Sequence, residues 1–232
     1  MSRGAGATIV TGGTGGLGVG VVRALVDADH DMIVTWIFER ELEQFPADLR
    51  DRCRLERVDV LSGDELGQLV ERCGQAGVWG LVHLVGGYLD GAPIADMDMA
   101  DWDLQLSLNL RSAALALRAV LPTMVERGHG RVVAISSRAA RLPFAGAAAY
   151  AASKAGVIAL VEAASEEVKR SGVCVNCVLP SVIDTPANRA AQPDADPSRW
   201  VRPEEIGAVI AFLCSTEAGA VTGAAIPVYG RA

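Results

Sequence analysis

Short apolar runs alternate with longer helical segments along the whole chain. This alternation predicts parallel strands joined by helices, because parallel neighbours need a long crossover connection. The segments that we assign to strands are 8–10, 32–35, 55–58, 80–84, 131–135, 173–179 and 225–228, and those that we assign to helices are 17–28, 63–76, 101–127, 148–171 and 203–216. The pattern predicts an α/β fold, with a doubly wound, seven-stranded parallel sheet and helices on both faces.

The length of the chain fits one domain. Its 232 residues are enough for one sizeable buried core and too few for two full domains without a visible linker, and no repeat or low-complexity tract interrupts them. We therefore predict a single domain over 1–232. Within it, the stretch 184–202 is rich in proline and in small or polar residues, and we interpret it as an irregular substrate lid.

Charge and hydropathy exclude several classes of partner. The formal net charge of -7 gives no general attraction to nucleic acid or to an anionic membrane surface. No run reaches eighteen uninterrupted apolar residues, and the start, 1–7, lacks the charged and apolar regions of a secretion signal. We predict a cytoplasmic protein with a small-molecule substrate, without a nucleic-acid or membrane partner.

The cysteines and histidines predict neither a disulfide framework nor a metal site. The five cysteines are scattered and odd in number, which favours reduced thiols. Cys174 and Cys177 form a CxxC, but they fall in a β-branched run where residues three apart face opposite sides of a strand. The histidines, His30, His83 and His129, are too dispersed to suggest a ligand set.

A glycine-rich run follows the first predicted strand and opens the first predicted helix. Glycines at 12, 16 and 18 allow a tight turn and a close approach of the backbone to a pyrophosphate, and the free N–H groups of the helix attract its charge. This position predicts dinucleotide binding. The residues that we expect to bind the cofactor here are Thr11, Gly12, Thr14, Gly16, Leu17 and Gly18.

The end of the second strand leaves the choice between NAD and NADP open. A carboxylate there would bind the ribose 2′-hydroxyl of NAD, and a basic residue would accept the 2′-phosphate of NADP. The sequence has Trp36 at this end, followed by Glu39 and Arg40, which favour opposite answers. After the third and fourth strands, we expect Asp59, Val60, Gly86 and Gly87 to lie against the cofactor.

Tyr150 and Lys154 are four residues apart in a predicted helix and therefore share one face. That spacing alone is common. The strand 131–135 that precedes it ends in Ser136 and Ser137, at the carboxyl edge where open α/β sheets bind ligands. This setting indicates a catalytic pair.

Four motifs in this order resemble the short-chain dehydrogenase/reductase family over nearly the full chain. They are the cofactor loop 11–18, Asn109 in the long helix, Ser137 thirteen residues before the tyrosine, and the YxxxK of Tyr150 and Lys154. The resemblance implies a Rossmann-like fold and an NAD- or NADP-dependent oxidoreductase that moves a hydride between the nicotinamide and a carbonyl or secondary alcohol.

The resemblance also implies a role for each catalytic residue. Tyr150 would exchange a proton with the substrate oxygen and Ser137 would hold that oxygen. Lys154 would bind the nicotinamide ribose and, together with oxidised nicotinamide, favour the phenolate of Tyr150, whose ordinary pKa is about 10. Asn109 would bind a water molecule that links Lys154 to solvent. Further along, Pro180, Ile183 and Thr185 match the segment that anchors the carboxamide.

Three departures from the family pattern stand out. The usual Asn-Asn-Ala-Gly after the fourth strand is replaced by His83, Leu84, Val85 and Gly86, which removes two amide side chains that would tie neighbouring elements together. Ser181 replaces a glycine, and Tyr229 replaces an acidic residue. All catalytic groups are present.

Alternatives remain at this point. The same fold serves non-catalytic dinucleotide sensors or scaffolds, and nucleotide-sugar epimerases or dehydratases with a larger substrate domain. A hydrolase lacks support because no GxSxG occurs. The segments 106–121 and 151–164 are apolar on most sides, which favours a homo-oligomer, a dimer or tetramer. Arg138, Arg141 and Arg189 are candidates to meet an acidic substrate, which the sequence does not identify.

Overall fold

The computed structural model describes residues 4–89 and 91–231, so the ends of the predicted 1–232 domain and Asp90 lie outside the described part. All seven predicted strands form, and each pairs in parallel with its neighbours. They are β1 (Ala7–Thr11), β2 (Asp31–Trp36), β3 (Cys53–Arg57), β4 (Val78–His83), β5 (Gly130–Ile135), β6 (Val173–Pro180) and β7 (Ala225–Val228). The order β3-β2-β1-β4-β5-β6-β7 confirms the doubly wound, Rossmann-like sheet.

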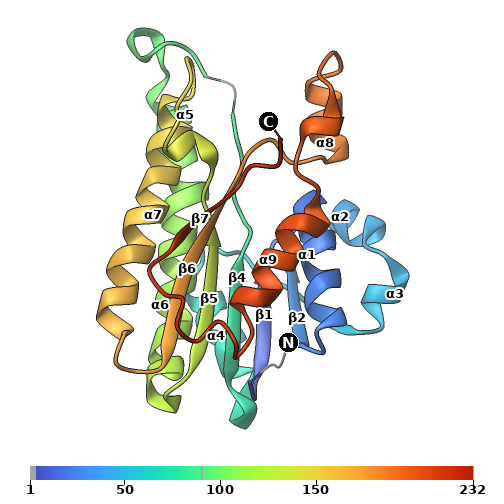
Figure 1. Cartoon of the computed structure of the whole chain (residues 1–232), viewed down its shortest axis with the longest axis vertical. Coiled ribbons are helices and arrows are strands. Elements are labelled where there is room, and N and C mark those ends of the chain that lie inside the picture. Colours follow the sequence, from blue (N-terminus) through green and yellow to red (C-terminus); the bar gives the residue numbers. More distant parts are fainter. Residues whose placement is uncertain (1–3, 90, 232) are drawn as a thin grey trace.

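Helices cover both faces of the sheet (Figure 1). The longer ones are α1 (Gly16–Asp27), α4 (Gly63–Glu71), α5 (Met99–Leu106), α6 (Ser112–Arg127), α7 (Ala148–Val168) and α9 (Pro203–Leu213). One buried core joins the sheet to α4, α6 and α7, and a second joins it to α1 and α9. The central strands are buried on both faces, which explains their continuous β-branched and apolar runs.

The predicted helix 101–127 is not one continuous α-helix. A π-helical turn, Ser107–Arg111, separates α5 from α6 and contains Asn109. Turns of this kind are frequent at functional sites, and their sequences carry no periodic signal that distinguishes them from an α-helix. The prediction was wrong here because the apolar pattern runs through the turn unchanged.

The expected irregular stretch 184–202 contains a short helix, α8 (Pro186–Ala191). Thr185 caps it by accepting a hydrogen bond from the backbone N–H of Asn188, and Pro186 occupies the first turn, where proline is favoured. Two further short helices that the sequence analysis missed, α2 (Glu39–Gln44) and α3 (Ala47–Arg50), lie between β2 and β3. Within the described residues, no helix is both long enough and apolar enough to cross a membrane.

Candidate active site

The sheet has a topological switch point between β1 and β4. From β1, the chain adds β2 and β3 on one side, and β4 to β7 on the other side. Ligands bind outside the carboxyl ends of parallel strands at such a switch point. The loop after β1, the segments after β4 and β5, and the start of α7 meet at this edge. The fold therefore brings the predicted phosphate loop and the predicted catalytic residues to one place.

The loop 12–15 is built for close backbone approach. Gly12 has a φ of 70°, in the left-handed region that favours glycine. A β-carbon on residue 18 would lie 2.4 Å from the carbonyl oxygen of Gly13, so only glycine permits α1 to begin here. A β-carbon on residue 16 would lie 3.1 Å from Thr185 Cγ2, which puts the base of the predicted lid directly against the loop. This cradle fits a dinucleotide pyrophosphate.

A carboxylate that the sequence analysis missed lies over the phosphate loop. The Thr14 hydroxyl donates to Glu41 Oε2 at 3.2 Å, which connects the loop to α2. The signal was absent from the sequence because α2 itself is short and was not predicted.

Of the three residues expected at the ribose 2′-position, Glu39 and Arg40 line a hollow at the end of β2, and Trp36 is the last residue of that strand. Trp36 pairs with Arg57 across the sheet. Ile37, Phe38, Glu39, Arg40 and Arg57 line an open hollow of about 460 Å³. The Arg40 guanidinium lies 5.2 Å from the centre of the Phe38 ring. Two guanidinium groups therefore border the place where the sequence predicted the ribose 2′-position, and Trp36 offers no carboxylate.

Asp59 is partly committed to the start of α4. Its Oδ1 accepts from the backbone N–H of Leu61 at 2.9 Å, while its own backbone N–H donates to Glu65 Oε2 at 2.8 Å. Val60 is buried in the core. These contacts fix the turn after β3 at the same sheet edge, and the expected adenine contact of Asp59 stays a prediction.

Asn109 holds the chain where it leaves β4. Its Oδ1 accepts from the Gly87 backbone N–H at 2.9 Å, and its Nδ2 donates to the Gly87 carbonyl at 3.0 Å and to Ser153 Oγ at 3.1 Å. The side-chain amides of Asn109 and Gln105 are 2.8 Å apart. The side chain thus links the turn between α5 and α6 to the loop after β4 and to α7, while its expected water contact stays a prediction.

Ser137 and Tyr150 are hydrogen-bonded to each other. Ser137 Oγ also accepts from the backbone N–H of Ala139 at 3.1 Å, so its single proton is available to the phenol oxygen. Burial raises the pKa of Tyr150, and the Ser137 hydrogen bond opposes that rise. In the protein alone burial prevails, and the expected joint effect of Lys154 and oxidised nicotinamide in favouring the phenolate stays a prediction.

Lys154 is buried, with only 3% of its surface exposed. Its Nζ donates to the Ile135 carbonyl at 3.0 Å and lies 6.0 Å from the centre of the Tyr150 ring. Burial lowers its pKa to about 8. Ser136, whose role the sequence analysis did not identify, donates through Oγ to the Lys154 carbonyl at 2.7 Å and fixes this turn of α7 on β5.

His83, which stands where the family pattern has an asparagine, connects two neighbouring elements through its ring. Its Nδ1 lies 2.8 Å from Thr11 Oγ1 and its Nε2 lies 3.0 Å from Ser112 Oγ. Ser112 gives its own proton to the Leu108 carbonyl, so Nε2–H must donate to Ser112 and Nδ1 must accept from Thr11. Burial, helped by repulsion from Lys154, lowers the pKa of His83 to about 3. A neutral imidazole therefore ties β1 to α6 at a position where the usual amide side chains are absent.

The other two departures from the family pattern contact each other. Ser181 Oγ donates to the Tyr229 carbonyl at 2.6 Å, which joins the ends of β6 and β7. The Tyr229 ring lies 5.9 Å from the Arg138 guanidinium. Nearby, the Ile183 carbonyl accepts from Asn188 Nδ2 at 2.8 Å. Arg189 forms a bidentate ion pair with Asp184, so its charge is largely balanced within the segment 184–202.

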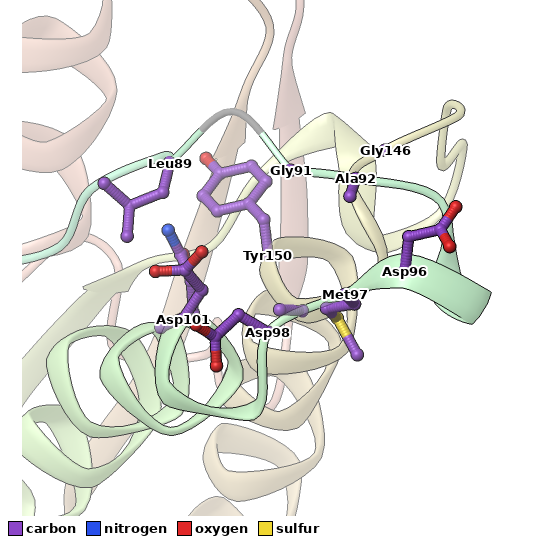
Figure 2. Close-up of a pocket in the computed structure, with 11 residues that line it drawn as sticks. Leu89, Gly91, Ala92, Asp96, Met97, Asp98, Asp101, Gly146 and Tyr150 are labelled. Atoms are coloured by element: carbon purple, nitrogen blue, oxygen red, sulfur yellow. The ribbon is translucent and has the colours of Figure 1, made fainter.

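A small cavity of about 130 Å³ lies beside Tyr150 (Figure 2). Its walls come from the segment after β4, the start of α5 and the start of α7, and include Leu89, Gly91, Ala92, Asp96, Met97, Asp98, Asp101, Gln105, Gly146, Ala149 and Tyr150. Gly91 and Gly146 meet closely, since a β-carbon on residue 91 would lie 2.4 Å from the Gly146 carbonyl oxygen. Two of the three carboxylates have a structural explanation, because Asp98 caps α5 and Asp101 lies in its first turn.

A glycine-lined phosphate cradle, a buried serine and lysine, and a half-buried tyrosine at one edge of a doubly wound sheet define a nicotinamide-dependent oxidoreductase. The family described as short chain dehydrogenase matches residues 7–196. The chain belongs to this family of enzymes.

Relatives agree over the whole length. The chain is 30% identical to an acetoacetyl-CoA reductase of Allochromatium vinosum, covering 96% of each protein. It is 31% identical to a cis-4-hydroxycyclohexanecarboxylate dehydrogenase of Sinomonas cyclohexanicum, covering 96% of this chain and 94% of the relative. Among solved structures, a short-chain type dehydrogenase/reductase from Mycobacterium ulcerans superposes with a TM-score of 0.92 at 29% identity, covering 99% of this chain and 90% of that one. The catalytic interpretation is thereby favoured over the non-catalytic alternative.

Proposed function

We propose that this oxidoreductase reduces a ketone or aldehyde with NADPH, or oxidises the corresponding secondary alcohol, through Ser137, Tyr150 and Lys154. The observation that carries the proposal is the contact between Ser137 and the Tyr150 phenol beside the buried Lys154 ammonium. When bound, the reduced cofactor would supply the hydride. Side chains of the protein would bind the substrate oxygen and transfer the proton.

Each catalytic residue has a role that its contacts support. The single Ser137 proton, which is directed at the phenol in the protein alone, turns to hold the substrate oxygen, and Tyr150 gives a proton to that oxygen during reduction. Lys154 supplies positive charge close to the phenol and stays mostly protonated at neutral pH, since its pKa is about 8. Asn109 fixes Gly87 and thereby holds the loop after β4 beside Lys154.

The preference for NADPH rests on charge at the end of β2. Arg40 and Arg57 line the hollow there, and the strand end carries Trp36 instead of a carboxylate that would repel a 2′-phosphate. Each charge-assisted contact to a phosphate contributes about 1.5–3 kcal/mol, or roughly ten-fold or more in affinity. The expected contacts of the glycine loop, Asp59, Val60, Gly86, Gly87, Pro180, Ile183 and Thr185 complete the cofactor site.

Turnover and binding test the two parts separately. We expect the purified protein to oxidise NADPH in the presence of a ketone panel, and Tyr150→Phe to lower kcat by about 10²–10⁴-fold with cofactor affinity kept. Tyr229→Phe is the matched control outside the reacting groups. Undiminished turnover in both Tyr150→Phe and Lys154→Ala would refute the mechanism, whereas cofactor binding without turnover of any carbonyl or alcohol would favour the sensing alternative.

Titration of NADPH and NADH tests the cofactor preference. The double variant Arg40→Ala, Arg57→Ala should weaken NADPH by at least about ten-fold and leave NADH unchanged. Tighter binding of NADH by the unmodified protein would instead favour Glu39 as the ribose ligand. The control is Arg23→Ala, which also removes a positive charge, one that is paired with Asp48 and does not line the hollow.

We also propose a homo-oligomer. The outer face of α7 carries alanines at 152, 155, 159 and 163 that alternate with its buried positions, and small side chains allow a second helix to approach closely. Sedimentation velocity would show a dimer or tetramer at micromolar concentration, and a monomer would contradict the proposal. The cytoplasmic location stays a prediction, which cell fractionation would test.

A further inference from the structure

Three aromatic rings form a continuous row at the active site. The Tyr88 ring lies 5.2 Å from the Tyr150 ring at 71° and 5.9 Å from the Phe144 ring at 60°, both edge-to-face arrangements. These distances fall within the range in which aromatic pairs stabilise each other. Tyr88 follows β4, Phe144 follows β5 and Tyr150 lies in α7, so the row joins three separate segments of the chain.

The outer two members of this row face solvent. Tyr88 is 44% exposed and Phe144 is 55% exposed, while Tyr150 is half-buried beneath the same segments. Leu142, in the segment of Phe144, is also largely exposed, as is Leu89, which lines the cavity with Tyr150. Exposed apolar side chains in contact with one another, as the Tyr88 and Phe144 rings are, mark a candidate binding surface.

The exposed rings adjoin the phenol of Tyr150, and this position indicates which part of a substrate would bind to them. Any group attached to a carbonyl that accepts the Tyr150 proton must lie within a few bond lengths of the phenol oxygen. The exposed apolar surface at that distance is aromatic and rigid, since it consists of rings with two rotatable bonds each. Flat rings gain more from such a surface than flexible alkyl chains, which lose rotamer freedom on binding.

We propose that Tyr88 and Phe144 are specificity-determining residues that bind a flat aromatic group attached to the reacting carbonyl of the substrate. The inference rests on the proposed carbonyl reduction. Tyr88 contributes most, because it is the middle ring and is in direct contact with Tyr150. A second copy of this chain is the alternative occupant, and oligomeric state distinguishes the two.

Three ketones test the proposal with NADPH as reductant. Acetophenone and 2-octanone have the same number of carbon atoms and differ in flatness, and 2-butanone lacks either extension. We expect the unmodified protein to favour acetophenone in kcat/KM. Tyr88→Ala should lower this value for acetophenone by about 3- to 10-fold and should change the other two by less than about two-fold. Tyr88→Phe should keep the preference, and Phe144→Ala should reduce it.

Controls separate selection from general damage. Phe212→Ala removes an exposed ring from α9 and should leave all three ketones unchanged. Circular dichroism and NADPH affinity report whether each variant folds. An equal loss for all three ketones in folded Tyr88→Ala would overturn the proposal, since Tyr88 would then support Tyr150 only structurally.

Two other results would also overturn it. An altered sedimentation coefficient of Phe144→Ala with an unchanged ketone preference would assign the surface to a contact between copies. Turnover without any preference for acetophenone would refute aromatic selection while leaving carbonyl reduction in place. Absence of turnover with any carbonyl would refute the proposed function itself.

Discussion

Gly86 and Lys154 are so close that a β-carbon on residue 86 would lie 2.8 Å from Lys154 Nζ. The same β-carbon would lie 2.6 Å from Asn109 Oδ1. Two buried polar groups from different helices therefore approach one backbone position after β4. A side chain at 86 would occupy the space into which the ammonium and the amide point, so both groups would have to move.

We predict that Gly86→Ala lowers kcat/KM by about 100-fold, since a displacement of about 1 Å at a catalytic group costs that much. Steady-state kinetics with NADPH and a ketone would measure the loss. Gly67→Ala is the matched control, because a β-carbon there meets nothing within 4 Å and alanine favours the α4 helix. Near-normal activity of Gly86→Ala would contradict the steric argument.

Replacement of the buried lysine separates stability from activity. Burial lowers the pKa of Lys154 from its ordinary 10.5 to about 8, so keeping the side chain charged at pH 7 costs on the order of 3 kcal/mol of folding stability. Replacing the lysine removes this cost, but it also removes the hydrogen bond to the Ile135 carbonyl, which offsets about 1–2 kcal/mol of the gain in stability. Lys154→Met should raise Tm at pH 7 by about 3–6 °C and abolish turnover.

The sign of the pH dependence provides a second check on Lys154. Between about pH 8 and 10.5 the unfolded chain binds the proton that the folded protein has lost, so stability of the unmodified protein rises with pH there. The advantage of Lys154→Met should shrink across this window. The other lysine of the sequence, Lys169, is exposed, and Lys169→Met should change Tm little at any pH. If Lys154→Met had a lower Tm than the unmodified protein at pH 7, the argument that the buried charge of Lys154 destabilises the fold would be wrong.

His83 should make the protein sensitive to acid. Its pKa falls from 6.5 to about 3 on folding, so between these values the unfolded chain binds one more proton. Stability should fall by up to about 1.4 kcal/mol per pH unit as pH drops through this window. Denaturant unfolding of His83→Gln should show a shallower loss, with His129→Gln as control.

Nitrogen chemical shifts provide a direct view of the same imidazole. We expect the neutral Nε2–H form of His83 at pH 6, because Ser112 can only accept and Thr11 can donate. A protonated ring or the Nδ1–H form at that pH would contradict the hydrogen-bond assignment.

The contact between Gly91 and Gly146 holds together two loops beside Tyr150. Gly91→Ala places a β-carbon against the Gly146 carbonyl and should raise KM by separating the loops. Gly146→Ala adds backbone strain of about 1–2 kcal/mol, because Gly146 has a φ of 80°. Urea unfolding should therefore show a greater loss for Gly146→Ala. Equal stability of the two variants would contradict the role of the left-handed backbone.

The sequence alone determined the sheet, its seven strands and the glycine loop. The spacing of apolar residues and the positions of the glycines can be read from short segments, and the tertiary contacts of this fold favour the same local structure. It also placed Tyr150 and Lys154 on one helix face. Short α2 and α8 escaped prediction because few residues carry their periodic signal, and with α2 the contact of Glu41 to Thr14 was missed.

Other features depend on contacts between segments that are distant in the sequence, and only the tertiary structure decided these. The π-helical turn at Asn109 hides within an apolar pattern, and the tie through His83 requires Thr11 and Ser112 to lie on either side of the same ring. The lowered pKa of Lys154 and the raised pKa of Tyr150 follow from burial, which a linear sequence does not express. Residue identity thus determined which groups react, and packing determined their protonation and their distances.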